Sequence, residues 1–279
     1  MSEQTSFFNQ KARHWGTIYG ERARNLGNTL TILPLVDSRL FSAGADAASF
    51  TTIRDNANGL SAVFTWSEAP SAFDTPLRLS RPTNWQGVIP LVTFNGTDEE
   101  ADSPDAPGWS RNDAAAAAWS LIVWANVTNT AAHRSFLAKH FGTTREWHFG
   151  IITTDLLRLT LYDESVDKET LRTSDAAIPM GAMTQFAMTY DGSGGATAGN
   201  GITLYVNGVA VASTATNDVD YVAMEDLGGV VELGDFNDSS FFSGKMAGGP
   251  LGPAKVDVAL TAAQILNDYR TGIKALEIS

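Results

Sequence analysis

Residues 201–213 consist of two runs rich in β-branched and aromatic residues that flank a short polar turn. The runs 201–206 and 209–213 lie on either side of Asn207-Gly208. Asn-Gly tolerates the positive φ angles of a two-residue type I′ turn, so the pattern predicts a tight antiparallel hairpin. Its pairing sets Leu204 opposite Val211, with side chains that alternate in direction along each strand. The hairpin therefore fixes one face of a β-sheet.

Short apolar runs separated by turn residues continue along the chain. They predict strands over residues 30–36, 62–66, 119–127, 135–141, 147–152, 156–162, 230–233 and 241–247. Strands at such short intervals are typical of an antiparallel β-sandwich. The run 119–127 is almost continuously apolar, as expected at the centre of a sandwich. Trp119 and Trp124 have opposite parity on it, so at least one of them faces away from the main core.

Helical spacing occurs near the two ends of the chain. Phe8, Trp15 and Tyr19 fall on one face of a short amphipathic helix that ends before residues 25–28. This helix must bury its apolar stripe, either on its own domain or on a neighbouring subunit. Near the other end, Thr261-Ala-Ala-Gln264 fits a capping box that begins a helix, and Gly272 is expected to stop it.

The charge balance limits the classes of partner. The formal net charge is −12, which argues against a general nucleic-acid binder because the phosphate backbone would be repelled. Residues 1–24 hold four Lys or Arg and two Glu, a net of +2, so −12 minus +2 leaves −14 for the rest. The chain has no cysteine, no apolar run long enough for a membrane span and no signal-peptide pattern at residues 1–6.

The basic N-terminal region suggests a docking arm. We expect residues 1–29 to form this arm and residues 30–279 to form the folded domain. An arm of this kind would attach the domain to an acidic partner surface, and a homo-oligomer is the expected assembly. The predicted docking residues are Phe8, Lys11, Arg13, Trp15, Tyr19, Arg22 and Arg24.

Five motifs in order carry a family resemblance. They are Phe94-Asn-Gly-Thr-Asp98, Trp119-Ser-Leu-Ile-Val-Trp124, Phe186-Ala-Met-Thr-Tyr-Asp-Gly192, Leu204-Tyr-Val-Asn-Gly208 and Gly249-Pro-Leu-Gly-Pro-Ala254. This pattern resembles the LamG-like jelly roll of the concanavalin A-like lectin/glucanase superfamily over roughly residues 87 to 272. The resemblance implies an all-β jelly-roll sandwich.

The resemblance also indicates where catalytic carboxylates or a calcium site would lie. Glucanases of the superfamily carry Glu-x-Asp-x-Glu on one strand, and the nearest stretch here is Glu100-Ala-Asp102-Ser-Pro104, whose third position is proline. We therefore expect no enzyme activity. Many members hold calcium near the tip of the sandwich, and Asn95 and Asp98 match that position. The alternative is that Asn95 and Asp98 only make turn hydrogen bonds.

Other candidate groups are ambiguous. His140 and His148 lie on successive predicted strands, in a register that the sequence leaves open by one residue, and we expect them to face solvent. Tyr162, Trp147 and Trp109 are candidates for an aromatic platform that would hold a sugar, although large aromatic residues are more often part of the core.

Non-enzymatic members of the superfamily bind carbohydrate or protein through loops at the rim of the sandwich. A LamG-like domain with a docking arm, no cysteine and no signal resembles bacteriophage virion proteins. We therefore expect a virion structural or decoration protein, made in the host cytoplasm, with possible glycan adhesion. The alternative is a free lectin or a polysaccharide-active enzyme of the same superfamily.

Overall fold

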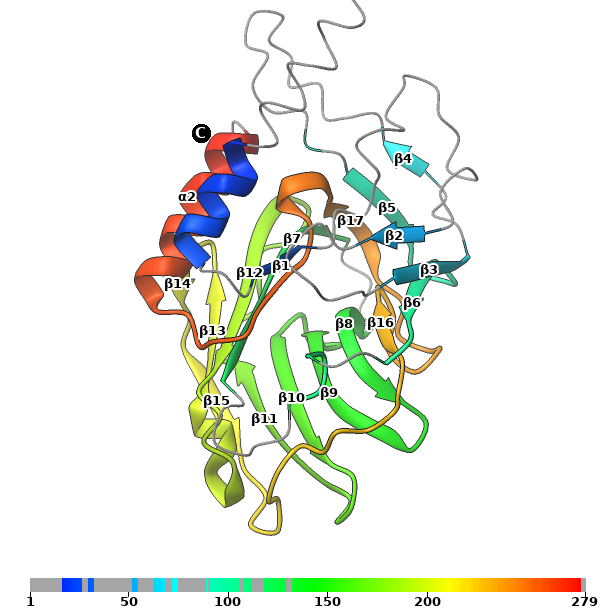
Figure 1. Ribbon diagram of the computed structural model, residues 1–279, viewed down its shortest axis with the longest axis vertical. Helices are drawn as coiled ribbons and strands as arrows, with labels where there is room; N and C mark the ends of the chain where they lie inside the picture. The colour runs from blue at the N-terminus through cyan, green and yellow to red at the C-terminus, as the bar shows by residue number, and fades with distance from the viewer. Residues whose placement is uncertain are drawn as a thin grey trace, which may run out of the picture.

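The protein is a β-sandwich of two antiparallel sheets (Figure 1). The computed structural model describes residues 17–26, 30–32, 52–54, 63–68, 72–74, 89, 91–105, 108–111, 118–128 and 132–276. Within these residues each sheet has nine strands. The predicted antiparallel jelly-roll fold is therefore confirmed.

The first sheet runs in the order β14, β13, β12, β7, β17, β5, β4. The bounds of these strands are Val209–Ala210, Ile202–Val206, Met183–Tyr190, Trp119–Val127, Ser243–Ala247, Leu91–Asn95 and Ala72–Asp74. β18 (Ala254–Val256) also pairs with β7, and β1 (Leu30–Ile32) pairs with β18. The predicted strand 119–127 thus lies at the centre of this sheet, as its apolar run indicates.

The second sheet runs in the order β15, β11, β10, β9, β8, β16, β6, β3, β2. The bounds are Ser213–Thr216, Lys168–Ser174, Leu157–Asp163, Thr144–Ile151, Arg134–Phe141, Val231–Leu233, Glu100–Ser103, Val63–Glu68 and Thr52–Arg54. The sequence pattern missed β2, β6, β11 and β15 of this sheet; β11 and β15 are mainly polar and show no clear apolar alternation.

The predicted hairpin is confirmed. Val206 pairs with Val209, and the turn residues Asn207 and Gly208 have φ angles of 51° and 78°. The amide of Val211 donates to the carbonyl of Leu204 at 2.9 Å. Leu204 is buried in the core between the sheets, so one face of the first sheet is fixed as expected.

The two tryptophans of β7 lie on opposite sides of the first sheet. Trp119 is in the core between the sheets, whereas Trp124 lies on the outer face, where α2 (Ala262–Leu276) covers it. Tyr269 of α2 stacks on Trp124 with ring centroids 5.7 Å apart. A Cβ atom on Gly272 would lie only 2.0 Å from Trp124 Cζ2, so this close approach requires glycine.

The predicted start of α2 is confirmed and its predicted end is wrong. The Thr261 amide donates to Gln264 Oε1 at 2.9 Å, and the Gln264 amide donates to Thr261 Oγ1 at 3.3 Å, as in a capping box. The helix continues past Gly272 to Leu276. The packing of Gly272 against Trp124, and not helix termination, accounts for the glycine at this position.

Residues 17–26 form a helix that lies beside α2 on its own domain (Figure 1). Ile18 and Leu26 are buried, and Arg22 is fully buried in an ion pair with Asp268 at 2.7 Å. The predicted docking role of Arg22 is therefore wrong, because its guanidinium is used within the chain. The sequence left open whether the N-terminal helix packs on its own domain or on a neighbouring subunit. Residues 17–26 pack on their own domain.

The other predicted docking residues have different positions. Tyr19 is partly buried against the core, and Arg24 is exposed. Phe8, Lys11, Arg13 and Trp15 lie outside the described residues. No helix in the described part of the chain has the length and apolar character needed to cross a membrane.

Candidate functional site

The loop between β16 and β17, residues 234–242, lies over the outer face of the second sheet. Trp147 and Phe149 of β9 belong to the core between the sheets, so His148 between them faces outward. Phe236 of the loop packs on His140 and His148, with ring centroids 4.2 Å and 4.3 Å apart. The loop is therefore anchored on β8 and β9.

The two histidines are buried beneath this loop, so the prediction that they face solvent is wrong. The exposed fractions of His140 and His148 are 7% and 3%. A β-bulge between Lys139 and His140 sets His140 opposite Arg145, which resolves the register that the sequence left open. Burial lowers the pKa of His140 to about 4 and that of His148 to about 3. Both rings are therefore neutral at neutral pH.

Aromatic and charged side chains lie at the end of the second sheet where contacts join the β8–β9 hairpin, the β10–β11 turn and the β16–β17 loop. We call this surface the sheet rim, and its members are Phe141, Arg145, Tyr162, Glu164, Asp167, Phe236 and Asn237. Arg145 lies 5.7 Å from the centroid of the Tyr162 ring. Its guanidinium makes ion pairs with Glu164 and Asp167, both at 2.5 Å. These two partners raise the pKa of Arg145, so the side chain stays charged.

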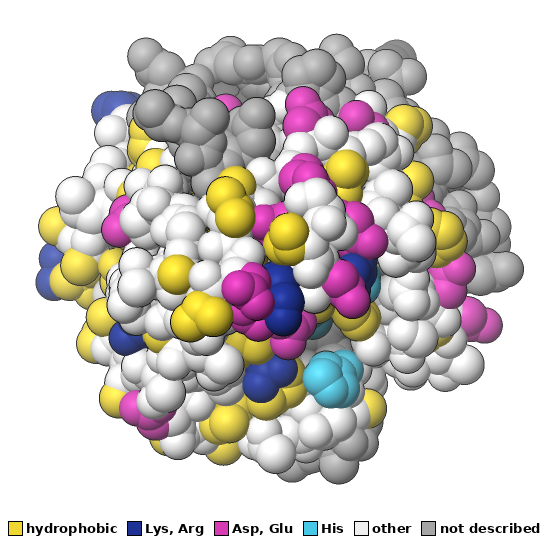
Figure 2. Space-filling view, turned by 90° about the horizontal axis from the view of Figure 1, so that it is seen from below, with side chains coloured by type: hydrophobic (Ala, Val, Ile, Leu, Met, Phe, Trp, Pro, Cys, Tyr) yellow, Lys and Arg dark blue, Asp and Glu magenta, His cyan; other side chains and the backbone are white. Residues whose placement is uncertain are grey.

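The loop contributes to the same surface. Asn237 Oδ1 accepts a hydrogen bond from the Gly142 amide at 3.0 Å, which joins the loop to the β8–β9 hairpin. The exposed fraction of Phe141 is 43%. Figure 2, which views the molecule from below Figure 1, shows acidic and basic side chains intermingled, with hydrophobic side chains scattered among them. This end of the sandwich is thus a mixed surface and not an apolar patch.

The predicted aromatic platform is only partly present. Trp109 and Trp147 are fully buried and stack on each other, and Trp147 Nε1 donates to the Trp109 carbonyl at 3.1 Å. Neither is available to a ligand, so the platform role predicted for them is wrong. Tyr162 does lie at the sheet rim. Phe141 and Phe236, which the sequence pattern did not single out, lie there too.

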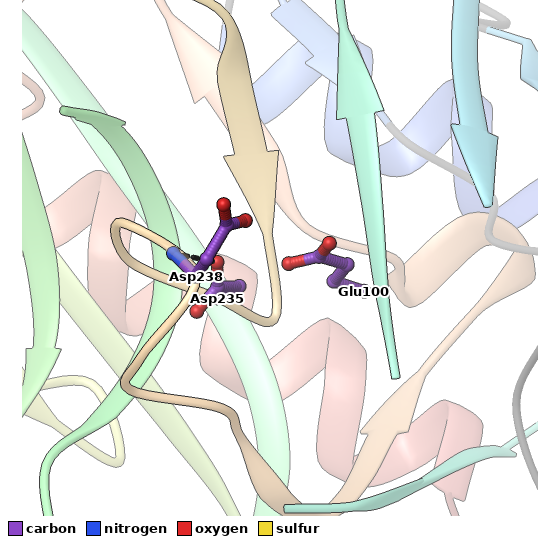
Figure 3. A group of neighbouring side chains, drawn as sticks. All are labelled: Glu100, Asp235 and Asp238. Carbon is purple, nitrogen blue, oxygen red and sulfur yellow. Dashed lines mark hydrogen bonds between the residues drawn. The ribbon is translucent and has the colours of Figure 1, made fainter. Parts of the chain in front are cut away.

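A group of carboxylates is formed by the β16–β17 loop and by β6. Glu100 reaches from β6 toward Asp235 and Asp238 of the loop (Figure 3). One carboxylate oxygen from each of the three lies within 4.8 Å of the others. We call Glu100, Asp235 and Asp238 the acidic triad. The Asp238 amide donates to Asp235 Oδ2 at 2.8 Å and the Ser240 amide donates to Asp235 Oδ1 at 3.3 Å.

Two further carboxylates surround the acidic triad. Asp102 lies two residues after Glu100 on β6, and Glu232 of β16 pairs with Asp102 across the sheet. Burial, followed by hydrogen bonding and repulsion from Asp235, raises the pKa of Glu100 to about 8. Burial and repulsion from Asp235 also raise the pKa of Glu232 to about 9. Both side chains are therefore mainly protonated at neutral pH unless a cation is bound.

The predicted calcium residues are engaged in a turn. Asn95 Nδ2 donates to Asp98 Oδ1 at 2.8 Å, and Asn95 Oδ1 accepts from the amides of Thr97 at 2.7 Å and Asp98 at 3.3 Å. Turn hydrogen bonding is thus the alternative observed for this pair, and calcium binding there stays a prediction. The acidic triad was missed because Glu100 and Asp235 are 135 residues apart, although Asp235 and Asp238 at i, i+3 in a Gly-Asp-Phe-Asn-Asp loop are a local signal.

Comparisons with solved structures support the fold. The binding domain of Botulinum neurotoxin serotype D, solved with N-acetylneuraminic acid, matches with a TM-score of 0.55 at 12% identity over 91% of this chain and 53% of that one. The serotype G binding domain matches with a TM-score of 0.54 at 11% identity over 79% and 48%. The chain thus spans about half the length of these structures.

Comparison with family models identifies the family of the chain. No curated protein matches the chain. The family model described as the concanavalin A-like lectin/glucanases superfamily matches residues 95–265, which is more than half of the chain. This range includes β7, the Asn207-Gly208 hairpin and the loop that carries Asp235. The chain therefore belongs to the concanavalin A-like lectin/glucanases superfamily.

Proposed function

We propose that this protein is a non-enzymatic carbohydrate-binding protein and that it binds glycans at the sheet rim. The observation that carries this proposal is that Arg145, ion-paired with Glu164, lies 5.7 Å from the Tyr162 ring centroid, near the end of β8 where Phe141 is 43% exposed. The C–H face of a sugar ring is apolar and packs on aromatic rings, while its hydroxyl groups exchange hydrogen bonds with guanidinium, carboxylate and amide groups. The sheet rim offers both kinds of contact.

The comparisons are consistent with a sugar ligand. The serotype D binding domain that shares this fold was solved with N-acetylneuraminic acid. Another toxin binding domain of the same fold was solved with rat synaptotagmin II, a protein ligand, at a TM-score of 0.54. A fold hosts many functions, so the choice of a glycan rests on the residues of the sheet rim.

The carboxylates of the second sheet support a non-enzymatic role. A glycosidase needs one protonated carboxyl as acid and one ionised carboxylate as nucleophile or base. In this chain the pKa values of Glu100 and Glu232 are raised together, to about 8 and about 9. Their exposed fractions are only 8% and 1%. Because both values are raised, Glu100 and Glu232 do not form such an acid and base pair with each other.

A glycan array followed by calorimetry tests the proposal. We expect the wild-type protein to bind a defined subset of glycans. The variants Phe141→Ala and Arg145→Gln should each lower the affinity for the best-bound glycan at least tenfold, which corresponds to about 1.4 kcal/mol. Val219→Ala is the matched control, because Val219 is 82% exposed and does not belong to the sheet rim. The proposal fails if no glycan binds, or if both rim variants bind as tightly as this control.

The same proposal includes attachment to a virion through the segment before residue 17. That segment carries Lys11 and Arg13 on a chain whose remaining charge is strongly negative, which supports docking on an acidic surface. Light scattering tests this part. We expect the full-length chain to be oligomeric and a chain lacking residues 1–16 to be a folded monomer. The same number of subunits for the two chains would argue against self-assembly through this segment.

A further inference from the structure

Two carboxylate oxygens, one in the acidic triad and one beside it, are buried without a hydrogen-bond partner among the described residues. Glu100 Oε2 and Glu232 Oε2 are both buried, and neither accepts a hydrogen bond from the described residues. The Glu100 side chain is directed toward Asp235 and Asp238 (Figure 3). An unsatisfied buried oxygen is costly and requires an explanation. Neighbouring carboxylates do not provide this explanation, because an ionised carboxylate has no hydrogen to donate.

We propose that Glu100, Asp235 and Asp238 bind a divalent cation, calcium by preference, with Glu232 beside them. Calcium takes about six to eight oxygen ligands at about 2.3–2.6 Å. Two ligands on opposite sides of the ion are therefore about 4.6–5.2 Å apart, and the three carboxylates of the triad group within 4.8 Å. Bidentate carboxylates and water complete the coordination. This inference holds whether or not the sheet rim binds a glycan.

The charge of the cluster favours a cation. Glu100, Glu232, Asp235 and Asp238 make no ion pair with a Lys or Arg side chain in the part of the chain that the structure describes. The groups that face Glu100 are Asp102 on its own strand, Glu232 on β16 and the two aspartates of the loop. A divalent cation offsets this repulsion, and buried oxygens such as Glu100 Oε2 can coordinate it.

The ligand set distinguishes calcium from softer metals. All three members of the triad offer carboxylate oxygen, which hard cations prefer over transition metals. The neighbouring His140 and His148 pack on Phe236 and do not join the triad. Calcium also suits a site in which two of the three ligands come from one loop, because it accepts irregular geometry more readily than magnesium.

The cation would act on the loop that forms part of the sheet rim. Asp235 and Asp238 flank Phe236 and Asn237, and Asn237 and Asp238 hold positive φ angles of 56° and 49°. The Asn237 amide donates to Glu232 Oε1 at 2.8 Å. A cation held between the loop and β6 therefore fixes the backbone that presents Phe236 and Asn237.

Calorimetric titration of the full-length, chelator-treated protein with calcium chloride and with magnesium chloride tests the proposal. We expect calcium to bind and to raise the melting temperature by several degrees. Glu100→Gln and Asp238→Asn are each expected to lower the affinity for calcium at least about tenfold. Asp238 is exposed, so its substitution keeps the test valid if the buried Glu100 variant fails to fold.

Asp98→Asn is the control variant, because it removes a carboxylate from the neighbouring turn and leaves the triad intact. We expect it to bind calcium as the wild type does. Absence of calcium binding at millimolar concentration would overturn the proposal. It would also be overturned if Asp98→Asn lost binding while Asp238→Asn kept it, since the ion would then lie in the Asn95–Asp98 turn. Binding of magnesium without calcium would overturn the choice of cation.

Discussion

Replacing Arg22 by alanine is expected to lower the free energy of unfolding by about 3–5 kcal/mol, because it leaves a buried carboxylate without its cation. Arg22 Nε donates to Asp268 Oδ1 at 2.7 Å, and Nη1 donates to the carbonyl of Pro250 at 2.8 Å. Both members of the ion pair are fully buried. After the substitution, the side-chain donor that remains to Asp268 among the described residues is Gln185 Nε2, which donates to its Oδ2 at 3.0 Å.

Urea unfolding of Arg22→Ala measures this loss, with Arg24→Ala as the matched control. Arg24 is exposed on the same helix, so its removal should change the free energy of unfolding by less than about 0.5 kcal/mol. A combined Arg22→Met and Asp268→Leu variant should recover most of the loss, since it removes both buried charges. An Arg22→Ala protein as stable as Arg24→Ala would show that the N-terminal helix does not pack on α2.

The second large effect expected is a fall in stability with rising pH that depends on Glu232. The folded-state pKa of Glu232 is raised to about 9, above its unfolded value, so the folded chain keeps a proton that the unfolded chain has lost. The stabilisation is therefore complete below about pH 4 and disappears as the pH rises through about 9. In chelator, the wild type should lose about 2 kcal/mol relative to Glu232→Gln between about pH 7 and pH 9.

Urea unfolding at several pH values measures this difference. The window above pH 7 avoids His140 and His148, whose lowered pKa values confine their effect to more acidic solution. Asp226→Asn is the control, because Asp226 is an exposed acid and its exchange should leave the pH profile of the wild type unchanged. If Glu232→Gln and wild type show parallel profiles, Glu232 is ionised in the folded protein and our electrostatic account of the cluster is wrong.

Local signals in the sequence predicted the parts of the fold that depend on neighbouring residues. The Asn207-Gly208 turn and the Thr261–Gln264 capping box formed as expected because their hydrogen bonds close within a few residues. Gly272 was misread because the reason for a glycine there is Trp124, which lies on another element. The sequence shows the glycine but not the indole ring that it must accommodate.

The candidate site depends on contacts that the sequence does not place. A β-bulge at Lys139 and His140 sets the register of the β8–β9 hairpin, and Phe236, from a distant loop, buries both histidines. The acidic triad likewise joins β6 to a loop 135 residues later. The predicted Asn95–Asp98 turn, by contrast, was recognisable locally, including its alternative of turn hydrogen bonds.

The measurement that tests the central claim most directly is amide chemical-shift mapping of the isotopically labelled protein with its best glycan from the array. If the sheet rim is the binding surface, the perturbed amides will cluster at Phe141, Arg145, Tyr162, Glu164 and Asn237, and Phe141→Ala will need at least about tenfold more glycan to give the same shifts. Perturbations confined to the opposite sheet or to the N-terminal helix and α2, with the sheet rim unchanged, would contradict the account.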